Sequence, residues 1–172
     1  MKYILILIAV LFVTPVYSQI KVDNNSYKFH ISFDNKWKEV SKVETDKKDV
    51  ITYSFSKNSK VAATIIAFKF VSPQKIDDLI YTLEKDFNLN IPERIGDYVK
   101  SDNESYESKS ADYKDKDTYE KIYYYTTIKD NNGEFYSYMI RFIADNSYKH
   151  SDFEYDVSSI INSFKINLWL IL

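Results

Sequence analysis

Tyrosine supplies most of the recognition chemistry in this sequence. The chain has 172 residues and 16 tyrosines, and four of them alternate around one predicted turn: Tyr123 and Tyr125 precede it, and Tyr136 and Tyr138 follow it. A tyrosine ring offers a large contact area at a low cost in side-chain entropy, and its hydroxyl forms hydrogen bonds. The sequence therefore predicts an aromatic binding surface made of these four side chains. We expect Tyr136, next to the turn, to be the most exposed of them and Tyr125 the most buried.

The turn is predicted from Asn132-Gly133, which lies between two β-rich segments at 119–129 and 134–144. This dipeptide is typical of a type I′ hairpin turn. With these two residues as the whole loop, Tyr124 lies opposite Arg141, where ring and guanidinium can stack. Both faces of the hairpin are apolar, so we expect the sheet to be covered on both sides. A second interpretation stays open, in which the tyrosines fill half-buried core positions, because tyrosine also favours strands.

Several enzyme classes are excluded by residue counts alone. The chain contains two glycines and no cysteine. A dinucleotide-binding G-x-G-x-x-G motif needs three glycines, and Gly96 and Gly133 are too far apart for a phosphate-binding P-loop. Neither glycine belongs to a G-x-S-x-G serine-hydrolase motif. Without cysteine there are no disulfides, thiol nucleophiles or cysteine-based zinc sites. We therefore predict that the protein uses no cofactor.

Metal binding and acid–base catalysis have few candidate residues. His30 and His150 are the two histidines, and neither has a partner nearby in the sequence, so we expect both to be solvated. The densest carboxylate group consists of Asp112, Asp115, Asp117 and Glu120. A calcium loop starting at Asp115 would need glycine at its sixth position, where this chain has Glu120. We predict no metal site and no catalytic residue. The alternative class is a carboxylate-dependent hydrolase, for example a carbohydrate-active one, because any acidic chain offers carboxylate pairs.

The balance of charge argues against polyanionic partners. The formal net charge is −2, there is no basic block, and Arg94 and Arg141 are the two arginines. Nucleic acid is therefore not expected as a partner. We expect a protein partner instead. The apolar tail at 166–172 is too short to span a bilayer, which takes about 20 residues. It could dock as a last strand or contact a partner or a membrane surface, and membrane-surface association is a third alternative function.

The first 18 residues have the features of a secretory signal peptide. Lys2 provides the positive start, residues 3–13 form an unbroken apolar run, and Val16-Tyr17-Ser18 places small residues where a signal peptidase cleaves. We predict cleavage after Ser18, a mature domain at 19–172, and a periplasmic or extracellular location.

Hydrophobic periodicity predicts the elements of the mature chain. Strands are expected at 27–33, 37–43, 50–55, 61–70, 95–100, 119–129 and 134–144. One helix is expected to begin at Ser72-Pro73 and run to Phe87, and another to begin with the capping box from Ser151 to Glu154. The polar stretch 101–117 is expected to form a long loop or a weak edge hairpin. This order predicts one α+β domain with a single antiparallel β-sheet flanked by helices.

Three parts of the chain resemble the Mog1/PsbP-like group of domains. The first is the opening strand Tyr27–Phe33 followed by Trp37, although the proline and glycine usual there are absent. The second is the strand at 62–70 leading into the helix at 72–87, and the third is the ending Ile160-Ile161-Asn162-Ser163-Phe164. The resemblance implies an α/β/α sandwich with a binding or assembly role. Members of the group serve partners as different as a photosynthetic complex and a small GTPase, so the resemblance assigns no ligand and no functional residue. We expect binding rather than catalysis.

Overall fold

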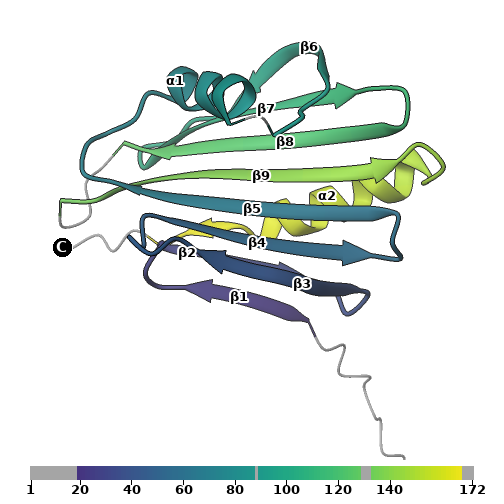
Figure 1. The fold of residues 1–172 in the computed structure, drawn as a ribbon, viewed down its shortest axis with the longest axis horizontal. Helices are drawn as coiled ribbons and strands as arrows, with labels where there is room; N and C mark the ends of the chain where they lie inside the picture. Colours follow the sequence, from purple (N-terminus) through teal and green to yellow (C-terminus); the bar gives the residue numbers. More distant parts are fainter. Residues whose placement is uncertain (1–18, 88, 129–132, 168–172) are drawn as a thin grey trace, which may run out of the picture.

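The computed structural model describes residues 19–87, 89–128 and 133–167, and its main layer is a seven-stranded antiparallel sheet (Figure 1). The strands follow the order β3-β4-β5-β9-β8-β7-β6. Their bounds are β3 Trp37–Glu44, β4 Val50–Lys57, β5 Val61–Phe70, β6 Glu93–Lys100, β7 Tyr106–Lys114, β8 Thr118–Thr127 and β9 Phe135–Asp145. The α+β class and the antiparallel arrangement predicted from the sequence are confirmed.

The prediction of a single sheet is wrong, because a second sheet of three strands is present. It has the order β1-β2-β10, with β1 Ile20–Asn24, β2 Phe29–Phe33 and β10 Lys165–Ile166. The turn at 34–36 sends the chain from β2 into the edge of the other sheet at Trp37, so consecutive strands belong to different layers. The apolar side of β2 is fully buried against the large sheet.

The stretch 101–117, expected as a loop or a weak edge hairpin, contains an inner strand. β7 pairs with β8 along its whole length and with β6 on its other side, so β6 is the edge. Ala111 and Tyr113 of β7 are buried against the first helix. The register between β6 and β7 is irregular from Ile95 to Val99, around Gly96 with its φ of +73°.

Two helical segments cover opposite faces of the large sheet (Figure 1). The first consists of α1 Ile76–Tyr81, continued by the π-helical turn η1 Thr82–Asp86, and the second is α2 His150–Ser163. Both were predicted to begin elsewhere, at Ser72-Pro73 and at the Ser151 capping box. The backbone N–H groups of Leu79 and Phe153 instead donate to the carbonyls of Lys75 and Lys149, which are the N-cap residues and have no side-chain cap. Ser151 is thus already inside α2.

Each face of the sheet has its own core, which confirms that the hairpin is covered on both sides. The larger core lies between the large sheet, the three-stranded sheet and α2, and includes Phe29, Phe55, Phe142 and Phe153. The smaller core lies under α1 and η1. There, one carboxylate oxygen of Glu84 accepts hydrogen bonds from three hydroxyls, those of Tyr98, Tyr113 and Tyr124. This carboxylate ties η1 to the strands beneath it.

A buried ion pair holds α2 on the sheet. Lys57, at the end of β4, donates to both carboxylate oxygens of Asp156 at 2.6 and 2.8 Å, and the Tyr148 hydroxyl donates to the same carboxylate at 3.1 Å. The two charged side chains are 8% and 2% exposed. Burial alone would lower the pKa of Lys57, but the bonded carboxylate of Asp156 outweighs it and raises the pKa. The Lys57 amine is therefore charged at neutral pH.

The β8–β9 hairpin has a register two residues away from the predicted one. Tyr124 faces Met139, Tyr125 faces Tyr138, and Arg141 faces Ile122, so Tyr124 and Arg141 do not form a cross-strand pair. The strands end at Thr127 and begin again at Phe135, which leaves more than the two loop residues assumed for the turn. Asn132 lies outside the described residues. A shift by two keeps every side chain on its predicted face, because side chains alternate with a period of two.

Candidate functional site

The four tyrosines predicted to form a binding surface separate into two pairs. Tyr136 and Tyr138 are fully buried, so the expected exposure of Tyr136 is wrong. The three-stranded sheet covers this end of the hairpin, and the Tyr138 hydroxyl donates to the carbonyl of Tyr27 at 2.8 Å. Tyr123 is half-buried and Tyr125 is 6% exposed, and both line a cavity beside the end of α2.

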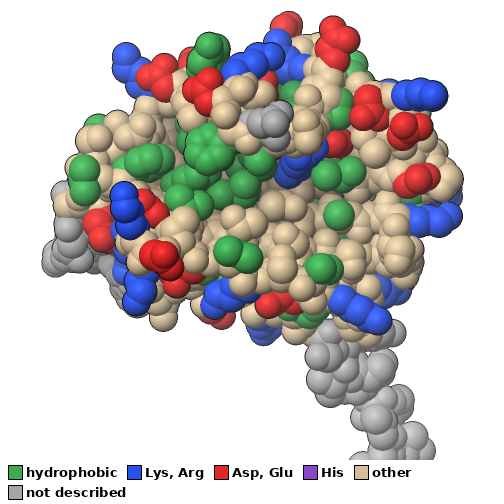
Figure 2. Space-filling view, in the orientation of Figure 1, with side chains coloured by type: hydrophobic (Ala, Val, Ile, Leu, Met, Phe, Trp, Pro, Cys, Tyr) green, Lys and Arg blue, Asp and Glu red, His purple; other side chains and the backbone are tan. Residues whose placement is uncertain are grey.

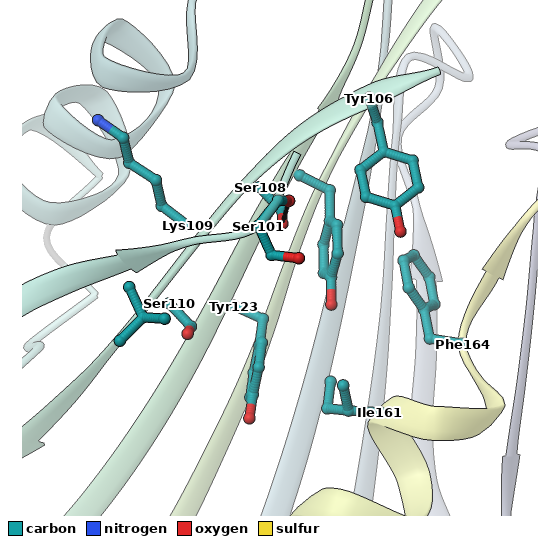
Figure 3. A pocket seen from close by; sticks show the side chains of 10 residues that line it. Ser101, Tyr106, Ser108, Lys109, Ser110, Tyr123, Ile161 and Phe164 are labelled. Atoms are coloured by element: carbon teal, nitrogen blue, oxygen red, sulfur yellow. Dashed lines mark hydrogen bonds between the residues drawn. The ribbon is translucent and has the colours of Figure 1, made fainter. Parts of the chain in front are cut away.

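This tyrosine cavity has a volume of about 230 Å³ and lies between β6, β7, β8 and the C-terminal end of α2 (Figure 3). Its lining consists of Val99, Ser101, Tyr106, Ser108, Lys109, Ser110, Tyr123, Tyr125, Ile161 and Phe164. The β7–β8 register places Ser110 beside Tyr123 and Ser108 beside Tyr125, so these side chains share one face of the sheet. Ile161 and Phe164 close the cavity from the helix side (Figure 3).

The tyrosine hydroxyls of the cavity are free to bind a ligand. Within the described part of the chain, the hydroxyls of Tyr106, Tyr123 and Tyr125 form no hydrogen bond, and none of these oxygens is shut off from solvent. Burial raises the pKa of both Tyr123 and Tyr125, so the two phenols are neutral at physiological pH. Each can therefore donate one hydrogen bond and accept another.

The cavity presents no charge of its own. Lys109 lines it through its backbone and stem, but its ammonium lies on the other face of the sheet, where it pairs with Asp77 of α1 (Figure 3). Neither a carboxylate nor an imidazole is among the lining residues. The arrangement can hold an uncharged group by aromatic contact and hydroxyl hydrogen bonds.

The other candidates from the sequence lie elsewhere and serve the fold. His30 lies 2.6 Å from Asp23 across the β1–β2 pair, and His150 lies edge-on to Tyr119 at the start of α2. In the acidic stretch, Asp115 accepts hydrogen bonds from the backbone N–H groups of Asp117 and Thr118. Glu120 is buried and forms a bidentate pair with Arg141. Over residues 19–87, 89–128 and 133–167, no group of three or more metal-ligating side chains comes together.

The opposite face of the sheet carries an apolar hollow, where hydrophobic side chains gather beside α1 and η1 (Figure 2). It has a volume of about 390 Å³ and is lined by Val50, Thr52, Thr64, Ile66, Phe68, Phe87, Leu89, Met139 and Arg141. Its one charged group is already engaged, because Arg141 donates to Glu120 and to the carbonyls of Leu89 and Asn90. The polar groups left in the hollow are the hydroxyls of Thr52 and Thr64, and no tyrosine lines it.

Of the ten residues that line the cavity, the sequence predicted only Tyr123 and Tyr125 as binding residues. Tyr106, Ser108 and Ser110 lie in the stretch expected to be a loop or a weak edge hairpin, yet they alternate along β7 at every second position. That period of two in Tyr-x-Ser-x-Ser was the available signal for a strand.

Comparisons with known proteins show what this architecture is similar to. No protein-family model matches the sequence, and no curated protein matches it significantly. Among solved structures, LpqN, described as involved in cell envelope biogenesis of Mycobacterium tuberculosis, superposes with a TM-score of 0.53 at 9% identity, over 88% of this chain and 92% of that one. The cyanobacterial PsbP protein CyanoP from Synechocystis superposes with a TM-score of 0.52 at 13% identity, over 90% and 95% of the two chains. The chain therefore has the Mog1/PsbP-like fold that its sequence predicted.

Proposed function

We propose that this protein is an exported binding domain that recognises a protein partner without catalysing a reaction, and that the tyrosine cavity is its recognition site. The observation that carries the proposal is the set of unbonded hydroxyls of Tyr106, Tyr123 and Tyr125 beside the apolar side chains of Ile161 and Phe164. Tyrosine combined with aliphatic contact is typical of protein recognition sites, because the ring supplies area and the hydroxyl supplies direction.

The chemistry of the cavity supports binding over hydrolysis. A carboxylate-dependent hydrolase needs two carboxyl groups facing each other across the substrate. The side chains that line the cavity are tyrosine, serine, lysine and apolar residues, and the lysine ammonium is bonded on the far face. A side chain of a partner protein fits a volume of about 230 Å³.

The signal-peptide pattern of residues 1–18, with its apolar run at 3–13 and its cleavage motif, supports export. Residues 1–18 lie outside the described part of the chain. Across residues 19–87, 89–128 and 133–167, no helix is long and apolar enough to cross a membrane. One protein of similar fold, LpqN, is described as acting in cell envelope biogenesis, and a place in the cell envelope suits a binding domain of this kind.

Export predicts a defined N-terminus. Mass spectrometry of the protein recovered from its native host should give Gln19 as the first residue, because Ser18 closes the predicted cleavage motif. Recovery of the intact chain from the membrane fraction would contradict export.

The recognition site can be tested by photo-crosslinking in the native host. Val99 on β6 lines the cavity and is 66% exposed, and Val43 on β3 is 63% exposed at the opposite edge of the same sheet. We expect a photoreactive p-benzoylphenylalanine at position 99 to give a discrete protein adduct, and the same residue at position 43 to give none.

The adduct should depend on the cavity. Adding Tyr123→Ser to the position-99 variant should reduce the adduct severalfold, because a half-buried ring and its hydroxyl leave the site. Equal labelling from positions 99 and 43, or no adduct from either, would refute recognition at this cavity.

A further inference from the structure

A second cavity lies on the same face of the sheet, at the other end of α2. It has a volume of about 370 Å³, and Ile95, Lys114, Tyr119, His150 and Phe153 are among its lining residues. Ser108 of the tyrosine cavity and Lys114 of the second cavity belong to one strand, six residues apart. At about 3.3 Å per residue, they are separated by roughly 20 Å.

A continuous strip of side chains joins the two cavities. In the β7–β8 register, Ser110 pairs with Tyr123, Asp112 with Lys121, and Lys114 with Tyr119, so all of them lie on the face that carries α2. On the helix, His150, Glu154 and Ile161 follow a spacing of four and seven residues and therefore form one stripe along this strip. We call Asp112, Lys121, Tyr123 and Glu154, which lie between the cavities, the charged strip.

The charged strip carries one more negative than positive charge. The Lys121 ammonium lies 2.9 Å from Glu154 and 3.6 Å from Asp112. Asp112 and Glu154 are 38% and 33% exposed, so both are accessible from outside. Within the described chain, Oδ1 of Asp112, which faces the Lys121 ammonium, and Oε1 of Glu154 accept no hydrogen bond but are closed to solvent, so a cation from outside would meet the other oxygen of each carboxylate. The strip thus has two carboxylates in contact with one ammonium, Lys114 of the second cavity is the next cation on this face, and a further cation beside the carboxylates would be stabilised.

We propose that an extended segment of the partner protein lies along the charged strip, with an apolar side chain in each cavity and a lysine or arginine beside Asp112 and Glu154. This inference rests on the proposed function and specifies its ligand. Side chains on one side of an extended peptide repeat about every 6.6 Å, which matches the alternate positions of β7 that make the floor. Two apolar anchors six residues apart then span the cavities. A neutral oligosaccharide would offer no counter-charge to the carboxylates of the charged strip.

The probe is a pair of capped heptapeptides with leucine at both ends, lysine at the third or fifth position and serine elsewhere, so that either chain direction is represented. The matched controls carry glutamate in place of lysine. We expect the better lysine peptide to bind about tenfold more tightly than its glutamate control, which corresponds to one favourable charge contact in a partly exposed site. Titration of the ¹⁵N-labelled mature protein by NMR gives the dissociation constants, and the shifted resonances should include Val99, Ser110 and Tyr119.

Asp112→Asn should remove most of this preference for lysine. Asp152→Asn is the matched control, because Asp152 is a 59% exposed carboxylate on α2 away from both cavities, and it should leave the preference intact. Far-ultraviolet circular dichroism verifies that each variant is folded.

The outcomes separate this inference from the proposed function. Equal binding of lysine and glutamate peptides, a preference that survives Asp112→Asn, or binding of maltoheptaose in place of the peptides would overturn the charged strip as a peptide site. A cavity-dependent adduct at position 99 would still support recognition at the tyrosine cavity. If no peptide binds, the inference is equally overturned, and the crosslinking result alone decides the proposed function.

Discussion

The folded protein is expected to unfold cooperatively between about pH 11 and 12, as its buried tyrosines are forced to ionise. Burial is the largest cause that raises the pKa of Tyr113, Tyr124, Tyr125 and Tyr138 above the ordinary value of 10.0. Neighbouring tyrosines, and Glu84 in the case of Tyr113 and Tyr124, raise it further. All four are at most 6% exposed. In the unfolded chain the same phenols lose their protons near pH 10.

Stability falls as the pH rises because the folded and unfolded states bind different numbers of protons. Above pH 10 the folded state holds more protons than the unfolded state, so stability is complete below pH 10 and falls as the pH rises towards the raised pKa values. Each buried tyrosine costs about 1.4 kcal/mol for each further pH unit, and four together cost roughly 5–6 kcal/mol per unit. A domain in the lower part of the ordinary stability range, about 5–10 kcal/mol, loses its folded state within one or two such units.

Tyrosinate absorbance at 295 nm, recorded together with circular dichroism, gives the measurement. The buried rings should become tyrosinate only as the fold is lost, whereas the ring of Tyr155 is 71% exposed and serves as the control position. Tyr125→Phe removes one raised phenol whose hydroxyl has no protein partner, and should stabilise the protein by about 2 kcal/mol at pH 11.5. Tyr155→Phe is the matched control and should not move the midpoint. Titration of every tyrosine near pH 10 with the fold intact would show the prediction to be wrong.

Removing one partner of the buried ion pair should have the second large effect. Asp156→Ala leaves the Lys57 ammonium, 8% exposed, without its counter-charge and deprives the Tyr148 hydroxyl of its acceptor. Breaking a buried pair in this way costs about 3–5 kcal/mol. Urea unfolding at pH 7 should show a loss of this size in the free energy of unfolding, whereas Asp152→Ala, an exposed carboxylate on the same helix, should change it by less than about 0.5 kcal/mol.

The double variant Lys57→Met with Asp156→Leu separates the pair's net contribution from the penalty of an orphaned charge. Replacing both charges with apolar side chains of similar volume is often neutral or stabilising, so most of the lost stability should return. A double variant as unstable as Asp156→Ala would mean that packing around α2, and not the unpaired ammonium, accounts for the loss.

The sequence predicted the positions of individual strands and helices better than it predicted which strands pair with each other. Strand β5 has the predicted bounds, Val61–Phe70, because a long apolar run buried on both faces has few alternatives. The strand β1 was not predicted, since Ile20–Asn24 is short and its pairing with β2 is not visible in local periodicity. The helix starts were misassigned because Ser72 and Ser151 are good capping residues that the backbone does not use.

The candidate binding site was also predicted only in part, because local alternation gives the face on which a side chain lies but not whether it is accessible. Alternation placed Tyr123, Tyr125, Tyr136 and Tyr138 on one face, and that face is the observed one. Which of them stay accessible depends on where the three-stranded sheet ends above the hairpin, and this sheet is assembled from residues far apart in the chain. No property of the hairpin sequence contains that information.

The three-stranded sheet also joins segments that are far apart in the sequence. β2 pairs with β10, Ser32 and Ser163 exchange hydrogen bonds, and the N–H of Asn167 donates to the carbonyl of Lys28 at 2.7 Å. During synthesis, the segment at 29–33 is made more than a hundred residues before its partner strand at 165–166. The larger core, which this layer closes, cannot be completed until the C-terminal strand has left the ribosome. A nascent chain that has not yet released residues 165–166 therefore lacks one strand of the layer that covers the larger core.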